Sequence, residues 1–363
     1  MMDGRLDEPA KTEEGFWSSF IGAPMTLSRR KFIQASSAAA TAASMMPRLA
    51  RSQSFTARQF HSQPEGSHLD IYLTKIWNAV REETNGRLSV ATYPRNNGIA
   101  VGDAEILTQL QGGRLEFFTL NGNILGHAHP AANIQGIPFA YSSSEQLTAL
   151  NDGAFGAYLR RELVSKGIQL IPFGSMENGF KQITSVDRPI LEAKDLRGFR
   201  MRVPNAQLFI DFYKALGAFP KIVDFNRMYK ALAAREVDGQ ENPLLDVEDN
   251  KLYEVCKHVG LTSHEWAGYN MLGNQTFWQR LPRDIQEAVI RNTKRFVPEQ
   301  RAFVQSLNAS ARSTLKDRGM IFTQVDTDSF RKTLTEAGFY KRWRAECGEE
   351  AWALMEAQTG SVG

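Results

Sequence analysis

The 363-residue sequence contains only two cysteines, Cys256 and Cys347, and they lie far apart without a CxxC pair or metal-ligand spacing. Two buried thiols are favoured over a single disulfide, and both interpretations stay open at this point. The sequence also lacks any run of eighteen or more apolar residues. It therefore predicts no membrane-spanning helix.

The sequence also lacks a large net charge. The formal net charge is +3, and the first 52 residues alone hold seven Lys/Arg against five Asp/Glu, so the rest of the chain is nearly neutral. A neutral body gives no support for nucleic-acid binding or for attraction to a membrane surface. With 42% hydrophobic and 23% charged residues, the chain has the composition of an ordinary globular protein, long enough for two domains with their own cores.

Familiar catalytic motifs are absent. No GxGxxG, P-loop, GxSxG or HExxH pattern occurs, so nucleotide binding, serine hydrolysis and zincin chemistry lack a starting point. His127 and His129 offer two metal ligands, but without a third at usable spacing a solvent-facing loop is favoured. We therefore predict no catalytic residue, no metal site and no cofactor.

The N-terminal region carries an export pattern. Residues 28–33 read Ser-Arg-Arg-Lys-Phe-Ile, the twin-arginine signature, and an Ala-rich, mildly apolar stretch follows. Small side chains at Ala50 and Ser52 predict cleavage before Gln53, and Met25 is a possible native start. The alternative is a coincidental arginine pair before an Ala-rich helix. The pattern predicts that residues 1–52 form a signal region and that the mature protein works in the periplasm.

Strand and helix patterns alternate along the mature chain. The first series of strands is predicted at 54–60, 88–94, 115–120 and 168–173, with helices at 69–84, 104–111 and 146–166. The second series has strands at 181–185, 198–203 and 221–224, with helices at 206–216 and 226–234. This alternation favours an α/β architecture with a largely parallel sheet. A long amphipathic helix is predicted from Leu281 to Arg318, kinked at Pro298, and a shorter helical tail from Asp328 to Ala357.

Two arginines stand in the stretch GFRMRVP at residues 198–204. Strand periodicity places Arg200 and Arg202 on the same face. An arginine there is either a surface charge or a buried anchor for a carboxylate, whose two oxygens match the guanidinium fork. Spacing alone favours the surface interpretation.

An ordered series of motifs resembles the solute-binding receptors of tripartite ATP-independent periplasmic (TRAP) transporters, of the dicarboxylate-receptor type. The resemblance covers nearly all of residues 54–355. It rests on the segments Ile137–Phe139, Gly179–Gln182, Arg188–Ile190, Ala193–Asn205 and, most specifically, VDGQENP at Val237–Pro243.

The resemblance implies a periplasmic-binding-protein-like fold. Two α/β lobes would enclose a ligand cleft, with crossing hinge strands between them and the late helix as a brace. Lobe I would comprise residues 53–174, completed by part of 265–300. Lobe II would comprise 175–264, completed by the C-terminal helices 301–363.

The resemblance also implies roles for individual residues. Arg202 would bind the ligand carboxylate, and Asn242, in an amide-rich loop, would face the ligand. Lys181 stands where many relatives have an arginine; it keeps the charge but loses the fork, so it makes a single-point contact or none. Ala104 stands where members that bind sialic acid carry an arginine, which disfavours that ligand.

Weaker candidates complete the predicted cleft. Asn121 follows a strand at the end where such folds place ligand loops. Trp266 and Phe225 could shield the ion pair, and His68 could reach it from the first helix. For the two aromatic residues, packing in the core is an equally open interpretation.

The implied function is an extracytoplasmic receptor that captures a small organic acid and delivers it to TRAP membrane subunits, acting as a monomer. A periplasmic sensor subunit and, less favoured, an exported enzyme on the same scaffold are the alternatives. Neighbouring genes for paired membrane subunits would separate the first two, and turnover of a bound acid would revive the third. The acid itself, and whether a cation assists its binding, stay open.

Overall fold

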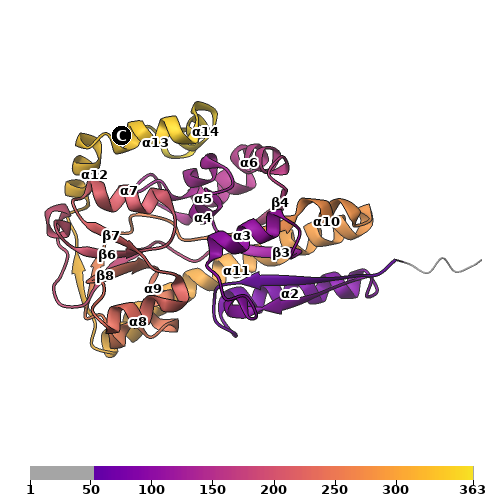
Figure 1. Cartoon of the computed structure of the whole chain (residues 1–363), viewed down its shortest axis with the longest axis horizontal. Helices are drawn as coiled ribbons and strands as arrows, with labels where there is room; N and C mark the ends of the chain where they lie inside the picture. The colour runs from indigo at the N-terminus through magenta and orange to yellow at the C-terminus, as the bar shows by residue number, and fades with distance from the viewer. Residues whose placement is uncertain (1–52, 363) are drawn as a thin grey trace, which may run out of the picture. The chain divides into compact units, whose positions relative to one another are not determined.

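The computed structural model describes residues 53–362, which form one compact unit built on two β-sheets (Figure 1). The predicted signal region at residues 1–52, with its export pattern and Met25, lies outside the described residues. Within residues 53–362, no helix has the length and apolar character needed to cross a membrane.

The first sheet has five strands in the order β2-β1-β3-β10-β4. The strands are β1 Phe55–His61, β2 Leu88–Tyr93, β3 Phe117–Asn121, β4 Ile168–Met176 and β10 Tyr269–Asn274. The helices of this lobe are α2 His68–Glu83, α3 Asp103–Gln111, α4 Gly122–Leu125, α5 Ser144–Asp152, α6 Ala154–Val164 and α10 Gln275–Arg280, with short 3₁₀ turns at Pro94–Asn96 and Pro130–Gly136. The helix predicted over 146–166 is in fact two, because Gly153 has non-helical backbone angles.

The second sheet has six strands in the order β11-β9-β5-β8-β6-β7. These are β5 Gln182–Ser185, β6 Arg200–Val203, β7 Phe219–Ile222, β8 Gly239–Asn242, β9 His258–Leu261 and β11 Ile321–Gln324. The accompanying helices are α7 Gln207–Ala215, α8 Met228–Ala233 and α9 Leu244–Asp249, with 3₁₀ turns at Ala193–Leu196, Phe225–Arg227 and Leu252–Glu254. A core of apolar side chains, Met228, Leu232, Val247 and Val259 among them, packs under α8 and α9.

Both sheets are mixed, so the prediction of a largely parallel sheet is wrong. In the first, β1 pairs in parallel with β2 and β3, whereas β10 runs antiparallel to β3 and β4. In the second, β5 runs antiparallel to both β8 and β9. The cause is the return of the chain from the second sheet to the first, which inserts β10 against the direction of its neighbours.

The amide-rich stretch 237–243 is not a loop. Gly239–Asn242 forms β8, paired with β5 and β6, and all four of its residues are buried. A side chain at Gly239 would lie 2.5 Å from the carbonyl oxygen of Thr184 and 2.8 Å from the Phe199 ring, so only glycine allows this close approach. The stretch reaches the ligand cleft only at the end of the strand.

Two segments cross between the sheets. Residues 177–181 lead from β4 to β5, and residues 262–268 lead from β9 to β10. They run side by side, with the Lys181 amide donating to the Glu265 carbonyl at 2.8 Å and the Ala267 amide to the Gly179 carbonyl at 2.9 Å. These are the crossing hinge strands that the resemblance implied.

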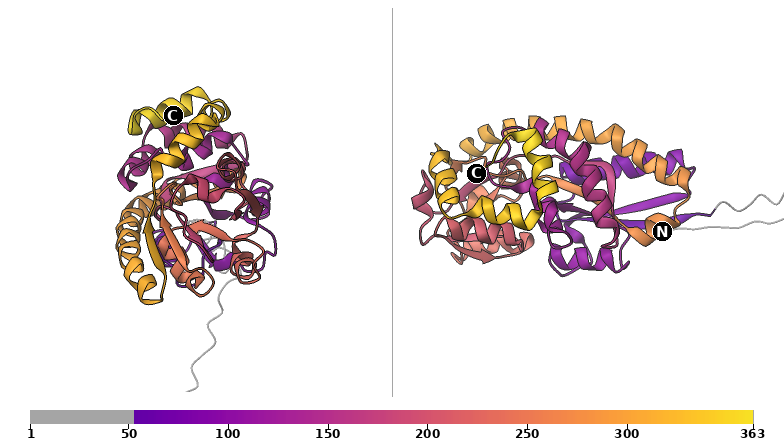
Figure 2. Two further views of the ribbon diagram at one scale, coloured as in Figure 1. Left: turned by 90° about the vertical axis from the view of Figure 1, so that its left-hand side faces the viewer. Right: turned by 90° about the horizontal axis from the view of Figure 1, so that it is seen from above.

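The long helix α11 Arg283–Asp317 braces both lobes, as predicted. It packs on α2 and β4 of the first lobe and on α9 of the second, and Figure 2 shows it running past both sheets. Pro298 lies inside the helix without ending it. The side chain of Asn308 accepts from the Leu245 amide at 3.1 Å and donates to the Asn178 carbonyl at 3.0 Å, so the helix also touches a crossing segment.

The C-terminal tail forms three helices, α12 Thr327–Glu336, α13 Phe339–Cys347 and α14 Glu349–Thr359, instead of one. Gly338 and Gly348 separate them with positive φ angles of 68° and 87°. Helices α12 and α13 pack on α7, but α14 packs on α5 and α6 of the first lobe (Figure 1). The tail therefore bridges both lobes and does not complete lobe II alone.

Both cysteines are free and buried, which confirms the prediction of two thiols.

Candidate ligand-binding site

A cleft between the two sheets gathers most of the predicted ligand-binding residues. It encloses roughly 780 Å³ of empty space, its open mouth included. Its lining comes from the first lobe at residues 101–104 and 121–124, from the second at 202–205, 224–226 and 241–246, and from the crossing segments. At one edge the lobes meet: a side chain at Gly102 would lie 2.6 Å from Asp224 Oδ1.

Arg202 lines this cleft. The side chain is buried, 2% exposed, and its Nε donates to the Val223 carbonyl at 2.8 Å. Among residues 53–362, neither terminal Nη nitrogen has a hydrogen-bond acceptor or a carboxylate within 4 Å. Burial lowers the pKa of Arg202 to about 10, against the opposing effect of nearby carboxylates, so the guanidinium stays charged at neutral pH.

The surface interpretation of the two arginines holds for Arg200 only. Arg200 begins β6, is half exposed, and forms an ion pair with Asp238 on the surface. Two residues later, Arg202 is covered, because β6 lies inside the sheet between β7 and β8 and ends in the cleft. Strand periodicity gives the face of a side chain but not its depth.

Asn242 lines the cleft at the end of β8. Its Nδ2 donates within the protein, to Gln240 Oε1 and to Met228 Sδ at 3.4 Å. Gln240 is fixed in turn by a 2.6 Å bond from its Nε2 to Thr184 Oγ1. The amide of Asn242 is thus already oriented beside the cleft.

Lys181 also lines the cleft, but its ammonium group is held by the protein. Lys181 Nζ lies 3.1 Å from Glu241 Oε1, 3.4 Å from Glu265 Oε1 and 3.6 Å from the centre of the Phe209 ring. The side chain is only 4% exposed. A direct contact between Lys181 and the ligand stays a prediction.

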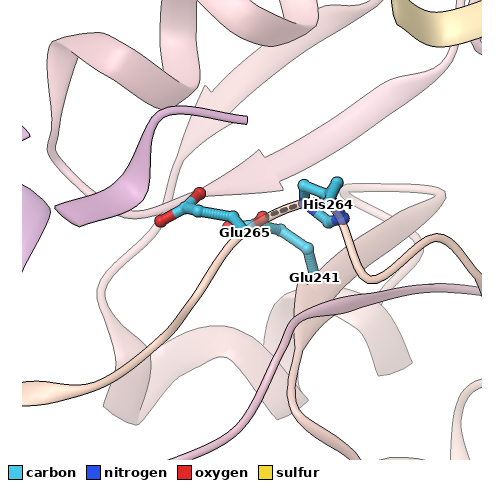
Figure 3. A group of neighbouring side chains, drawn as sticks. All are labelled: Glu241, His264 and Glu265. Carbon is cyan, nitrogen blue, oxygen red and sulfur yellow. Dashed lines mark hydrogen bonds and ion pairs between the residues drawn. The ribbon is translucent and has the colours of Figure 1, made fainter. Parts of the chain in front are cut away.

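Behind Lys181 lies a buried cluster that the sequence did not indicate: Glu241, His264 and Glu265 (Figure 3). Their potential ligand atoms lie within 4.8 Å of one another, a spacing that a metal ion can bridge. Within the described chain the ammonium of Lys181 already supplies a cation to both carboxylates. Glu241 alone belongs both to this cluster and to the cleft lining.

Hydrogen bonds order this cluster. His264 Nε2 lies 2.7 Å from Glu241 Oε2, His264 Nδ1 lies 2.8 Å from Thr262 Oγ1, and the ring stacks on Phe212. Burial lowers the pKa of His264 and raises the pKa of Glu265 well above its ordinary value, so both favour the neutral form. One positive lysine then faces one negative carboxylate, Glu241, which leaves the cluster nearly neutral.

The weaker candidates divide between the cleft and the layer behind it. Asn121 lines the cleft and donates to the carbonyls of Ala267 and Gly268 at 3.2 and 3.3 Å, and half-buried Phe225 lines the opposite lobe. Trp266 lies outside the lining, with its Nε1 2.6 Å from Glu177 Oε1.

His68 also lies outside the lining, because its ring is turned toward α11 and a crossing segment. Its Nε2 lies 3.0 Å from Asn178 Oδ1, and its Nδ1 lies 3.0 Å from Gln300 Nε2. Burial lowers its pKa to about 4. It therefore supports Asn178, which does line the cleft, and does not itself reach the lining.

Three aspartates complete the lining, and sequence reasoning missed them. Asp246 accepts from Gln63 Nε2 at 3.1 Å and from Asn178 Nδ2 at 2.9 Å, and burial raises its pKa to about 7. Asp103 accepts from Asn96 at 2.8 Å, and burial raises its pKa to about 6. Asp224 is exposed at the mouth. No local motif distinguishes these residues from surface acids.

The raised pKa of Asp246 predicts a pH dependence of stability. The folded protein holds this proton up to about pH 7, whereas an unfolded aspartate loses it near 3.9, so stability rises as the pH falls through 7. From pH 8 to 6.5, Asp246 and Asp103 together add about 1 kcal/mol to the free energy of unfolding. Thermal unfolding should show the part of this gain that comes from Asp246, about 0.8 kcal/mol, as a change between the two pH values in the stability difference between the wild type and Asp246→Asn, which lacks the titrating proton.

The histidines oppose this effect over the same range. The lowered pKa values of His68 and His264 destabilise the folded protein as an unfolded histidine takes up a proton, around pH 6.5, so wild-type stability alone changes little, and this cost is the same in Asp246→Asn. A stability difference between the wild type and Asp246→Asn that is the same at pH 8 and at pH 6.5 would contradict the assignment. Asp187→Asn, at an exposed surface position, is the control and should keep the wild-type pH dependence.

Two lobes, crossing segments, a bracing helix and a cleft with a free guanidinium define a solute-binding protein. Residues 60–342 match the family described as bacterial extracellular solute-binding protein, family 7, and the chain belongs to this family. The resemblance to TRAP receptors is thereby confirmed. The family is one of solute-binding proteins and not of enzymes.

Individual relatives agree with this assignment. The chain is 28% identical over 285 residues to a solute-binding protein of Roseobacter denitrificans, covering 78% of this chain and 86% of the relative. It is 30% identical to the C4-dicarboxylate-binding periplasmic protein DctP of Rhodobacter capsulatus, covering 76% and 82%. A TRAP periplasmic solute-binding protein of Polaromonas sp. JS666, solved bound to D-erythronate, superposes with a TM-score of 0.78 at 28% identity, covering 84% and 99%.

Proposed function

We propose that this protein is the extracytoplasmic receptor of a TRAP transporter and that it binds a small organic acid through Arg202. The observation that carries the proposal is a buried, charged guanidinium that lines the cleft and whose two Nη nitrogens have no hydrogen-bond acceptor among residues 53–362. A carboxylate fits this fork with two parallel hydrogen bonds. The relatives that bind C4-dicarboxylates and D-erythronate, both carboxylates, support the same class of ligand.

The lobes explain how binding would be signalled to a transporter. A ligand held by Arg202 of the second lobe also meets residues 101–104 of the first, so it favours the closed arrangement of the two lobes. The membrane subunits would then recognise the closed receptor. Asn242, Asn121 and Phe225 would line the bound acid, with the receptor acting as a monomer.

A thermal-shift screen of the purified protein against a panel of organic acids tests the proposal. A ligand that binds only the native state stabilises it by mass action and so raises the melting temperature. At a ligand concentration of a hundred times the Kd, the free energy of unfolding rises by about 2.7 kcal/mol. At least one carboxylate should produce a concentration-dependent rise, and the corresponding amide or methyl ester should not. If carboxylates and their esters behave alike, the receptor proposal fails.

We also propose export by the twin-arginine pathway, on the strength of residues 28–33. Replacing Arg29 and Arg30 together with lysine should leave the precursor in the cytoplasm, whereas the native sequence should yield mature protein in the periplasm. Cell fractionation and immunoblotting measure the two pools. Replacing Arg48 and Arg51 with lysine is the matched control, and equal export of all three proteins would contradict the assignment.

A further inference from the structure

The cleft combines one available cation with several carboxylates. The two Nη nitrogens of Arg202 have no acceptor among residues 53–362, whereas the ammonium group of Lys181 is already paired with Glu241 and Glu265. Around Arg202 stand Asp103 from the first lobe and three acids of the second: Asp224, Glu241 and Asp246. Each of these four lies close enough to raise the pKa of Arg202 by its charge.

The carboxylates differ in how much hydrogen-bonding capacity remains. Glu241 is engaged at both oxygens, by Lys181 and by His264. A carboxylate has about four acceptor sites. Asp246 and Asp103 therefore keep free lone pairs after their bonds to Gln63, Asn178 and Asn96. The carboxylate of Asp224 has no side-chain donor among the described residues.

Free donors are scarce inside the cleft. The amide nitrogen of Asn178 donates to Asp246 and Tyr269, that of Asn121 to two backbone carbonyls, and that of Asn242 to Gln240. Asn205 and Asn226 line the cleft only at exposed positions. The hydroxyls of Ser62 and Tyr269 also line the cleft, but neither is charged, so the interior provides one cationic seat for a ligand carboxylate and an excess of acceptors around it.

The excess of carboxylates over available cations decides which further polar groups the ligand can carry. At pH 8, above the pKa values of Asp103 and Asp246, a second carboxylate would have to lie among Asp103, Asp224 and Asp246, where like charges repel it and no free cation compensates. A hydroxyl or ammonium group in the same place would donate to an ionised acceptor, one of the stronger hydrogen bonds available to a protein.

Given the receptor function above, we propose that the ligand is a monocarboxylate whose other polar groups are hydrogen-bond donors, hydroxyl or ammonium, and that Asp103, Asp224 and Asp246 exclude dicarboxylates. The proposal separates this chain from its C4-dicarboxylate-binding relative. It makes Arg202 the anchor of the ligand and the three aspartates its specificity determinants.

Calorimetric titration of the purified protein with acids matched in length tests the proposal. The four-carbon set is butyrate, succinate, D-erythronate and 4-aminobutyrate; the six-carbon set is hexanoate, adipate, D-gluconate and 6-aminohexanoate. At one length, the hydroxylated or the amino acid should bind at least about tenfold tighter than both the plain acid and the dicarboxylate. Whichever binds more tightly, the hydroxylated acid or the amino acid, shows whether the donor group of the ligand is a hydroxyl or an ammonium group.

The other outcomes are distinct. Succinate or adipate binding as tightly as the donor-bearing acid, or the plain acid doing so, would overturn this inference and leave the receptor function standing. Failure of every acid to bind would overturn both.

Isosteric variants test the aspartates directly. In titrations at pH 8, above the pKa of Asp246, Asp224→Asn and Asp246→Asn should each reduce several-fold the ratio of the affinity for the donor-bearing acid to that for the dicarboxylate, because each removes one repelling charge. Asp224 is exposed and bonds to no described side chain, so its replacement keeps the fold intact. Asp187→Asn, on the surface beside Arg235, should leave the preference unchanged. An unchanged preference in both cleft variants would overturn the assignment of these residues.

Discussion

Replacing Arg202 with glutamine is expected to weaken binding of the cognate acid at least about 100-fold, roughly 3 kcal/mol. The guanidinium is buried, remains charged and lines the cleft, and neither Nη nitrogen has a hydrogen-bond acceptor among residues 53–362. Glutamine retains much of the side-chain length but neither the charge nor the fork. Calorimetry with the tightest acid of the panel measures the loss.

The neighbouring arginine provides a matched control. Arg200 lies on the same strand, but half exposed and paired with Asp238, so Arg200→Gln should bind as the wild type does. Arg202→Lys should fall between the two, because a lysine keeps the charge and loses the bidentate geometry. Equal affinities of Arg200→Gln and Arg202→Gln would show that Arg202 is not the anchor.

Replacing Lys181 with methionine is expected to lower the free energy of unfolding by about 3–5 kcal/mol. The ammonium lies between Glu241 and Glu265 at 3.1 and 3.4 Å, and all three side chains are buried. Without it, Glu241 stays in the core with only His264 beside it, and burial then disfavours its charged form. Thermal and denaturant unfolding should both report the loss.

Two further variants separate charge from packing. The double variant Lys181→Met/Glu241→Gln should regain part of the stability, because it removes the negative carboxylate that Lys181→Met leaves without its cation. Lys194→Met removes a lysine from an exposed pair with Glu192 and should cost less than about 1 kcal/mol. Similar losses at Lys181 and Lys194 would contradict the role of the buried cluster.

The position of this cluster gives it mechanical significance. Lys181 lies on one crossing segment, Glu265 on the other, and Glu241 on β8 of the second lobe. The same contacts that stabilise the core therefore join the two crossing segments. Glu241 extends this network to the cleft lining, so the site and the connections share a residue.

Much of the architecture was readable from local patterns. In α2, the apolar positions Leu69, Leu73, Ile76 and Val80 recur at helical spacing and are all buried, and Asn85 and Gly86 end the helix with positive φ angles. The motif series, above all VDGQENP, indicated the family and thereby the two lobes, the crossing strands and the bracing helix. Arg202 and Asn242 came with the same motifs.

Local patterns failed where distant segments decide the outcome. VDGQENP has the composition of a loop, yet β5 and β6 pair with it and make it a buried strand. The mixed sheets arise because the chain returns from the second lobe to insert β10, a long-range event that no strand encodes alone. For the same reason, the tail helices could not be assigned to both lobes from their periodicity.

The sequence by itself determined the family, the position of Arg202 and the export pattern, because each resides in a short, contiguous motif. Only the tertiary structure decided the electrostatics of the site. Asp103, Asp224 and Asp246 come from separate elements and resemble surface acids until folding brings them around Arg202. Burial then raises the pKa values of Asp103 and Asp246, since desolvation depends on what covers a group in space and not on its neighbours along the chain.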